Sequence, residues 1–417
     1  MRSDSSPARK LPLPSPSPTP PPKRRPEKDN IKKLNIPRKV QKKLKIFSVR
    51  LGLDLTFLFL VVILLIIGMI MMFSASYPSA LEYTGNSYSY LLRQMLFAGI
   101  GVAAMIILSY FDYHHFHKLA IPIMIAALLA LVITLFIPSS TGVHRWIGIG
   151  SFNIQSSEIA KFAVILFLAH FNSKYFKKMD TFRFGVLPGL VLMALVSFLL
   201  ILEPHYSGIV IIAMLIVLMM FISGVKLRYF IIAGALLVGV VMVLLVTGKL
   251  GYAMQRLDGW GQALNYTTED MWQSTYQTRN SLYAIGSGGI WGLGLGQSRQ
   301  KYLYIPEVQN DFVFAVVCEE LGFVGAAIIL CIFALLVWRG ITLSMRAKDK
   351  FGSLLGIGLS AQIGLQVILN IMVITDWLPN TGISLPFFSY GGSSLIMLLA
   401  QMGIVLSISR TSNLEKV

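Results

Sequence analysis

Long apolar stretches recur along the chain, separated by polar connections. A helix needs roughly 20 mostly apolar residues to cross the hydrocarbon core of a bilayer. Ten stretches come near that length, and the predicted spans are 54–75, 90–109, 118–137, 157–172, 184–202, 206–223, 228–247, 311–337, 353–375 and 389–408. The pattern therefore predicts an all-α polytopic membrane protein with about ten transmembrane helices.

The composition agrees with this prediction. Of the 417 residues, 55% are hydrophobic and 13% are charged, and the mean hydropathy is +0.68. A soluble domain carries about 25% charged residues. The two cysteines, Cys318 and Cys331, lie in one apolar stretch, where we expect free thiols that act as small apolar residues.

The net charge of +17 is concentrated at the amino terminus, where residues 1–50 hold 15 Lys or Arg against 3 Asp or Glu. This placement favours an anionic cytoplasmic leaflet as partner and argues against nucleic acid. Residues 1–30 also hold nine of the 18 prolines, which predicts a disordered tail. The basic segment 31–50 either lies on the membrane surface or extends the solvated tail.

Basic residues in the connections predict the orientation, because cytoplasmic loops carry an excess of Lys and Arg. Four connections fall on the side of the amino-terminal tail. Three of them are basic, namely 173–183, 224–227 with the adjacent Arg228, and 338–352, while 110–117 is histidine-rich. Both termini are therefore expected in the cytoplasm. The predicted division is a tail over 1–50, a membrane domain over 51–410 with a large outer loop over 248–310, and a short tail over 411–417.

The loop and the start of the eighth predicted span hold the first candidate chemistry. Arg299 and Lys301 follow a glycine-rich run, and the apolar stretch then opens with Asp311 and carries Glu319 and Glu320. Acids in such a stretch are expensive and mostly face a cavity or a partner. We expect a basic loop to hold an anionic headgroup beside Asp311, and loop amides or basic side chains to satisfy the two glutamates.

A second set of charges lies before and within the fourth predicted span. Glu158 and Lys161 are three residues apart, so they share one face of a helix. They form either a structural ion pair or the polar floor of a substrate cavity. Arg145, in the preceding outer loop, either contacts a phosphate or anchors the loop at the interface.

Two further outer connections contain proline. His205, after Pro204, is expected to be a turn residue rather than a metal ligand, because no Cys/His cluster accompanies it. The stretch 379–394 is either a re-entrant turn between helices or a wall of the cavity that Asp311 faces. Ser393 is its candidate for substrate contact.

Three separated motifs in this order resemble the SEDS family (shape, elongation, division and sporulation), which includes FtsW, RodA and SpoVE. They are HRWIGIGSFNIQSSEIAK, SGGIWGLGLGQSRQKYLYIPEVQNDFVFAVVCEELGFVG and TGISLPFFSYGGSS. The resemblance covers roughly 50–410. It implies the SEDS-type fold and a peptidoglycan glycosyltransferase that polymerises lipid II at the outer face of the cytoplasmic membrane.

The resemblance also implies partners and a cofactor. The partners are lipid II, membrane lipids, a class B penicillin-binding protein that crosslinks the strands, and the membrane proteins of the divisome. The cofactor is a divalent cation, Mg or Mn. The long tail and the ISR sequence that ends the last span favour the division-type member, at the septum.

Site residues follow from the same motifs. The family's essential acid corresponds to Asp311, as general base or as holder of the cation, and its polar pair to Glu158 and Lys161. Its basic loop positions correspond to Lys301 and Arg256. Where the family has Gln-Pro-Asp, this chain has Glu203-Pro204-His205, so Glu203 is expected to carry the charge.

Three other functions fit parts of the pattern. A lipid II flippase would use the same polar cavity without making a bond, and an elongation or sporulation-type polymerase would differ only in its place in the cell. A scaffold that recruits a synthase would not need Asp311. Polymer formation from lipid II by the purified protein separates the enzyme from the flippase and the scaffold.

Overall fold

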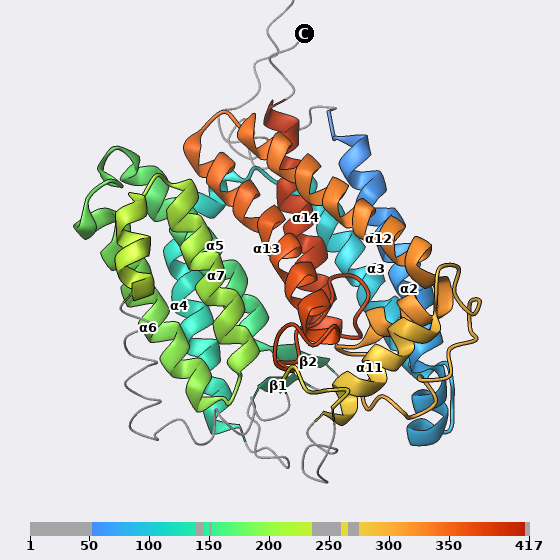
Figure 1. The fold of residues 1–417 in the computed structure, drawn as a ribbon. Coiled ribbons are helices and arrows are strands. Elements are labelled where there is room, and N and C mark those ends of the chain that lie inside the picture. Colours follow the sequence, from blue (N-terminus) through green and yellow to red (C-terminus); the bar gives the residue numbers. More distant parts are fainter. Residues whose placement is uncertain (1–51, 138–144, 150–151, 236–259, 266–274, 413–417) are drawn as a thin grey trace, which may run out of the picture. The chain divides into compact units, whose positions relative to one another are not determined.

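The computed structural model describes residues 52–137, 145–149, 152–235, 260–265 and 275–412. All of them belong to Leu44–Val417, one of two compact units of the chain. The described part is built mainly of helices (Figure 1). They are α2 (Leu55–Thr84), α3 (Ser89–Tyr110), α4 (His114–Phe136), α5 (Ser156–Lys174), α6 (Leu187–Leu202), α7 (Tyr206–Ile222), α11 (Tyr276–Ser287), α12 (Val313–Met345), α13 (Lys350–Ile374) and α14 (Gly392–Ser412).

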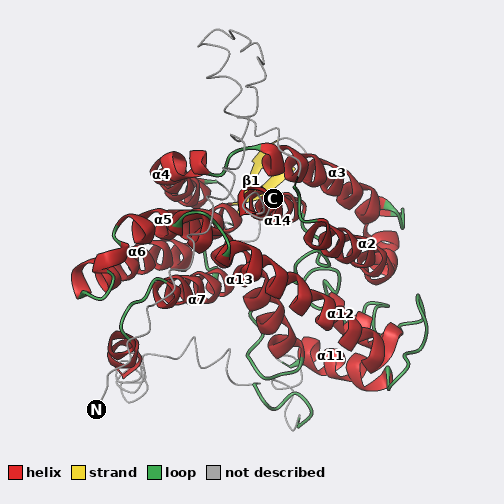
Figure 2. Ribbon diagram, turned by 90° about the horizontal axis from the view of Figure 1, so that it is seen from above, coloured by secondary structure: helices red, strands yellow, loops and turns green. Residues whose placement is uncertain are grey.

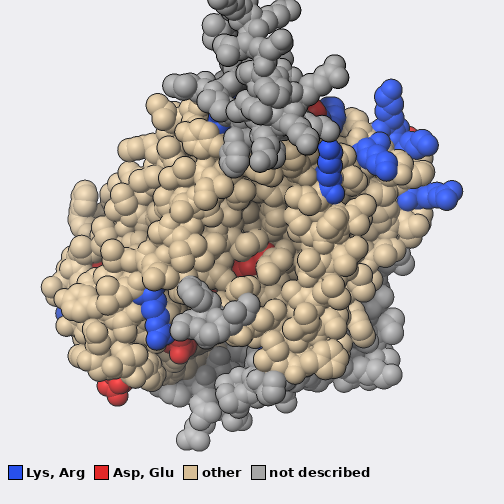
Figure 3. Space-filling view, turned by 180° about the vertical axis from the view of Figure 1, so that it is seen from behind, with Lys and Arg blue, Asp and Glu red and all other residues tan. Residues whose placement is uncertain are grey.

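Nine of the predicted spans fall on described helices, which confirms the helical prediction. The seventh, 228–247, is helical up to residue 235, and the rest of it lies outside the described residues. Among the described helices, α2, α3, α4, α12, α13, α14 and the continuous helical stretch Phe182–Leu202 are long and apolar enough to cross a membrane, and α7 is apolar but shorter. Figure 3 shows one face that is nearly free of charged side chains across its middle.

The fourth predicted span forms α5, but α5 is not among the helices apolar enough to cross a membrane by that measure. It packs against α4, α7 and α13, and most of its residues are buried (Figure 2). Because protein rather than lipid surrounds α5, it can hold charged residues that a lipid-facing helix would exclude.

The last helix packs most extensively on α3 (Figure 2). Two glycines allow the close approach, since a Cβ at Gly403 would lie 2.5 Å from the Met105 carbonyl oxygen, and one at Gly101 would lie 2.6 Å from Leu399 Cδ1. Small residues at such contacts let helix backbones approach closely in membrane proteins. This pair of helices supports the wall of the site described below.

The eighth predicted span, 311–337, forms α12, which extends eight residues beyond the predicted end and is not continuous. The helix runs from Val313 to Met345 and is interrupted at Gly322, whose φ of 67° is left-handed. The glycine-rich loop after α11 crosses this break, and Leu293 N–H donates to the Glu319 carbonyl at 2.9 Å. A Cβ at Gly292 would lie 2.2 Å from the Glu320 carbonyl oxygen, so only glycine permits the crossing.

A two-stranded hairpin is the part of the fold that the all-α prediction missed. Strands β1 (Trp146–Ile149) and β2 (Phe152–Gln155) pair antiparallel, with Trp146 opposite Gln155. The hairpin leads directly into α5 and packs against α14. It therefore holds the segment after Arg145 against the helices at one end of the bundle (Figure 1).

The connection between α13 and α14 is a buried turn among the helices, as one of the two hypotheses for 379–394 stated. Leu385, Phe387 and Phe388 are buried in it. The turn reaches the middle of α2, where a Cβ at Gly68 would lie 2.4 Å from the Phe387 carbonyl oxygen. The backbone of this loop is therefore fixed by contact with α2.

Candidate active site

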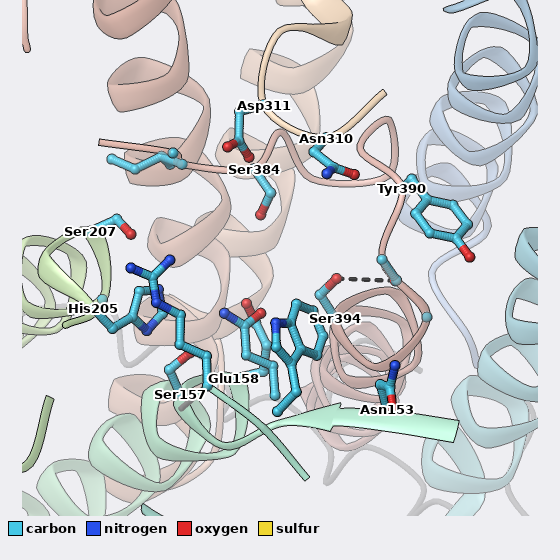
Figure 4. Close-up of a pocket in the computed structure, with 18 of the residues that line it drawn as sticks. Asn153, Ser157, Glu158, His205, Ser207, Asn310, Asp311, Ser384, Tyr390 and Ser394 are labelled. Carbon is cyan, nitrogen blue, oxygen red and sulfur yellow. Dashed lines mark hydrogen bonds between the residues drawn. The ribbon is translucent and has the colours of Figure 1, made fainter. Parts of the chain in front are cut away.

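A cavity of about 420 Å³ opens where several of these loops and helix ends meet. Its walls come from α3, the hairpin, the first turns of α5 and α7, the segment before α12 and the connection before α14. Figure 4 shows Asn310, Asp311 and Ser384 along one side of it, and Ser157 and Glu158 along the other. Pockets of roughly 300–1,000 Å³ are the usual size for small-ligand sites.

Asp311 lies in the turn just before α12, outside the helix itself. Asn370 of α13 donates from Nδ2 to the Asp311 carbonyl and to the Ile383 carbonyl, each at 2.7 Å. A Cβ at Gly382 would lie 3.0 Å from Asp311 Oδ2, so the carboxylate rests against a loop glycine. These contacts fix the acid at the cavity wall between two loops.

Burial raises the pKa of Asp311 to about 6, while the charge of Arg145 lowers it and that of Glu307 raises it further. A carboxyl with such a pKa is ionised at neutral pH yet accepts a proton more readily than an ordinary aspartate. General bases work best when their pKa lies near the operating pH. Asp311 is therefore the candidate general base among the described residues of the cavity.

Glu158 and Lys161 also line the cavity, and they form an ion pair. Lys161 Nζ donates to Glu158 Oε1 at 2.8 Å, and 4% and 9% of the two side chains are exposed. The pair is therefore a buried ion pair that also forms part of the cavity wall, and its contact with a substrate stays a prediction. A second, smaller cavity of about 20 Å³, lined by Glu158 with Gln362 and Gln366, shares part of this wall.

Two arginines add positive charge to the same cavity. Arg145 donates to the Pro204 carbonyl and lines the wall, and Arg93 of α3 lines it at an exposed position. With Lys161, the lining therefore holds three cations, against the carboxylates Glu158 and Asp311. This balance suits a ligand that carries negative charge.

Among the described residues of the wall, some buried side-chain atoms have no hydrogen-bond partner within the described part of the chain. They include Ser157 Oγ and His205 Nδ1. These two residues are 1% and 7% exposed. Buried polar groups are almost always satisfied in proteins, so these atoms indicate a wall built for a polar ligand or ordered water.

Lys301 and Arg299, the basic residues of the loop, do not line this cavity. Lys301 is 3% exposed, and its Nζ pairs with Glu320 Oε1 at 2.8 Å and donates to Ser74 Oγ at 3.1 Å. Arg299 is exposed, and its backbone N–H donates to Glu319 Oε1 at 2.9 Å.

As the sequence predicted for the two glutamates, loop amides and a lysine satisfy them. Ser298 adds its hydroxyl to Glu319 and its backbone N–H to Glu320.

Three other candidates have different positions. Glu203 is fully buried behind the wall, where it accepts hydrogen bonds from Thr134 and from Ser156. Ser393 lies beside the cavity, and its Oγ accepts from the Gln155 N–H at 3.2 Å. Arg256 lies outside the described residues.

Sequence reasoning missed some of the lining. Arg93 stands one turn inside the second predicted span, and a charged residue at that place was a usable signal. Tyr390, which packs edge-on against Tyr90 with ring centroids 4.9 Å apart, and Asn310 gave no such signal. His205 was expected to be only a turn residue, yet it also lines the cavity.

Comparison with known proteins shows which family the chain resembles in sequence. The family model described as "Cell cycle protein", of FtsW, RodA and SpoVE, matches residues 55–414. Stage V sporulation protein E of Bacillus subtilis is 40% identical over 86% of this chain and 97% of its own length. A probable peptidoglycan glycosyltransferase FtsW of Geobacter metallireducens is 36% identical over 85% of this chain and 94% of its own.

Solved structures agree with the fold. The crystal structure of the rod shape determining protein RodA of Thermus thermophilus has a TM-score of 0.62 and 27% identity, covering 87% of this chain and 98% of that one. A chain from a structure titled "Structural coordination of polymerization and crosslinking by a peptidoglycan synthase complex" has a TM-score of 0.70 and 25% identity, covering 87% of this chain and 99% of that one.

Proposed function

Because the chain belongs to the family of FtsW, RodA and SpoVE cell cycle proteins, we propose that it is a multi-pass membrane peptidoglycan glycosyltransferase that polymerises lipid II. The observation that carries the proposal is the cavity in which Asp311 faces a wall that carries Arg145 and Lys161. Lipid II brings a sugar hydroxyl to be deprotonated and a diphosphate to be released. The cavity offers an acceptor for the proton and cations for the anion.

The reaction joins a sugar hydroxyl of one substrate to the anomeric carbon of another. The carboxylate of Asp311 takes the hydroxyl proton as the new C–O bond forms, and the bond to the diphosphate breaks with its electron pair on the leaving group. Base assistance of this kind is typically worth about 10²–10⁴-fold in rate. Arg145, Arg93 and Lys161 stabilise the leaving diphosphate, since fixed positive charge in a partly enclosed site acts more strongly than in water.

Two helix ends add to the anion side of the cavity. The first turns of α5 and α7, through Ser157 and Ser207, both line it. A helix amino terminus carries partial positive charge and free N–H groups, which favour phosphate. The diphosphate is therefore placed toward these helix ends and the acceptor hydroxyl toward Asp311.

The divalent cation that the resemblance implies stays a proposal. Among the described residues, no group of three or more His, Cys, Asp or Glu side chains converges to hold a metal ion. Magnesium is often bound through few protein carboxylates together with substrate phosphates and water. A cation in this cavity would take most of its ligands from the diphosphate and would neutralise part of its charge.

We further propose that the chain synthesises septal peptidoglycan during cell division, together with a class B penicillin-binding protein. Support comes from relatives named FtsW and from the structural neighbour titled for polymerisation and crosslinking, while the sporulation-named relative supports the rival role. Depletion of the protein from cells distinguishes these roles. Loss of a septal enzyme should give filaments, loss of an elongation enzyme should give rounded cells, and loss of a sporulation enzyme should affect spores alone. We also propose that both termini lie in the cytoplasm, as the basic loops predict.

The deciding experiment incubates purified protein with lipid II in detergent, without an ion gradient, and separates the glycan products by length. Polymer from the wild type and none from Asp311→Asn supports the enzyme. The same protein in lipid II vesicles is scored for transfer across the bilayer. Transfer without polymer would replace the glycosyltransferase by a flippase.

A further inference from the structure

His205 is held tightly in the cavity wall, at the turn that joins α6 to α7. It is the residue before the first turn of α7, and its side chain makes no capping hydrogen bond. A Cβ at Gly208 would lie 2.9 Å from His205 Nδ1, so the imidazole rests directly on that first turn. The residue is 7% exposed, and Nδ1 is buried without a hydrogen-bond partner among the residues that the structure describes.

Positive charge surrounds this imidazole. Arg145 donates to the carbonyl of Pro204, the adjacent residue, and Lys161 lines the same cavity. The amino terminus of α7 contributes further partial positive charge. Burial lowers the pKa of His205 to about 3, and the charges of Arg145 and Lys161 act in the same direction. The imidazole is therefore neutral at physiological pH when the cavity holds no anion.

The other charged and titratable groups of the cavity come from five parts of the fold. They are Arg93 of α3, Arg145 before β1, Glu158 and Lys161 of α5, Asp311 before α12 and Tyr390 before α14. Glu158 is already paired with Lys161. No carboxylate of the described lining is therefore placed on His205 by a hydrogen bond or ion pair of the structure.

We propose that His205 takes up a proton from solvent when a diphosphate group enters the cavity, and then donates a hydrogen bond to that group as an imidazolium. The proposal rests on the proposed function, because it names the residue that answers the charge of the substrate. An opposite charge within about 4–6 Å favours the charged form of a titratable group, and a diphosphate carries at least two negative charges. The step forms one N–H bond on the imidazole with a proton from solvent, and this bond breaks and returns the proton to solvent when the diphosphate leaves.

The linkage has a definite sign. A group whose pKa rises on binding strengthens binding at low pH, and this gain is lost as the pH rises through the pKa of the bound state. Where uptake is complete, affinity weakens tenfold for each unit of pH. The diphosphate titrates as well, but its contribution is the same for the wild type and for a variant that differs only at residue 205.

The test measures binding of geranylgeranyl diphosphate to the purified full chain by calorimetry between pH 6 and 8, in two buffers of different ionisation enthalpy. Wild type and His205→Gln are compared, and His114→Gln, at a half-exposed histidine outside the cavity, is the matched control. We expect the wild type and the control to take up as much as one proton more than His205→Gln. Their affinity should fall with pH more steeply, by as much as tenfold per unit.

Gly208→Ala gives a second variant, because its new Cβ forces the ring from its place, and it should also flatten the slope. The same difference with inorganic pyrophosphate assigns the effect to the diphosphate itself, and a difference seen only with the prenyl ligand assigns it to a lipid-anchored diphosphate. Equal proton uptake and equal slopes in wild type and His205→Gln overturn the proposal, even when the protein polymerises lipid II. Absence of both binding and polymerisation instead removes the proposed function.

Discussion

Replacing Asp311 by asparagine should have two opposite effects, a loss of polymerisation activity and a gain in stability at neutral pH. The substitution keeps the size of the side chain and its contact with Gly382, but it cannot accept a proton from a sugar hydroxyl. Loss of a general base is expected to lower the polymerisation rate by about 10²–10⁴-fold. Asp311→Glu should retain a trace at most, because the additional methylene moves the carboxylate within a fixed wall.

The same substitution should stabilise the fold at neutral pH. The pKa of Asp311 rises from 3.8 to about 6 on folding, a difference of about two pH units, each worth about 1.4 kcal/mol. Ionisation therefore costs the folded state nothing below pH 4, a growing amount between pH 4 and 6, and at most about 3 kcal/mol above pH 6. Water in the cavity screens the charge, so 3 kcal/mol is an upper limit.

Thermal unfolding of the wild type and Asp311→Asn in detergent, at pH 5 and at pH 8, measures this difference. The variant should unfold at a higher temperature than the wild type, and its advantage should be larger at pH 8. Asp180→Asn, at an exposed aspartate paired with Lys226, is the matched control and should show neither the loss of activity nor the stabilisation.

Two results would refute the reasoning about Asp311. Purified Asp311→Asn that polymerises lipid II at near wild-type rate removes the residue from the mechanism, whichever role it is given. A variant that is less stable than the wild type at pH 8 shows that the carboxylate makes favourable contacts in the folded state. Wild-type activity should also fall about tenfold per unit of pH below pH 6, as Asp311 becomes protonated.

Three further predictions address the rest of the chain. Lys301→Ala should destabilise the protein by about 3–5 kcal/mol in thermal unfolding, because it leaves Glu320 buried without its cation. The double variant Lys301→Met with Glu320→Gln should lose much less stability, and a double variant less stable than the single one contradicts this prediction. Single cysteines at Gln262 and at Lys348 should label with an impermeant thiol reagent only at Gln262 in intact cells, and labelling at Lys348 alone reverses the orientation. Deletion of 1–30 should leave polymerisation by the purified protein intact, and its loss would give the tail a catalytic role.

The spans were predictable because membrane-length apolar runs are a one-dimensional signal. The break in α12 could not be predicted, because it depends on contact between two backbone segments that are distant in the sequence. The break at Gly322 exists where the loop at Gly292 crosses α12, and neither glycine reveals its partner in the sequence. The hairpin over 146–155 is short, and its strand pattern lies between much stronger helical signals.

The site was predictable in part for the same reason. Asp311, Glu158 and Lys161 stand near the starts of apolar runs, where charge has few roles, and Arg145 stands in the loop before one of them; the fold brings all four to one cavity. Asn310 and Tyr390 are polar residues of ordinary loops, so nothing in the sequence distinguishes them from residues that face solvent. Only the course of the connection before α14 places them at the cavity.

The fate of each basic residue depends on the nearest carboxylate, which the sequence does not reveal. Lys301 and Arg145 both stand in loops predicted to lie outside, and both were candidates for the substrate anion. Glu320 draws Lys301 into a buried ion pair that holds the loop against α12, so its charge is used within the fold. The charge of Arg145 instead acts on Asp311 and on His205 across the cavity.

In the turn between α6 and α7, too, the sequence does not reveal which charged or polar side chain faces the cavity. Glu203 was expected to carry the charge at the substrate, but two residues that flank a proline point to opposite sides of the wall. Glu203 turns inward to Thr134 and Ser156, and His205 turns to the cavity. Since Glu158 is paired with Lys161, Asp311 is the carboxylate of the described lining that has no ion pair there. Under the proposed function, the diphosphate is therefore expected beside Arg145, Lys161 and His205, with Asp311 as the acceptor of the proton.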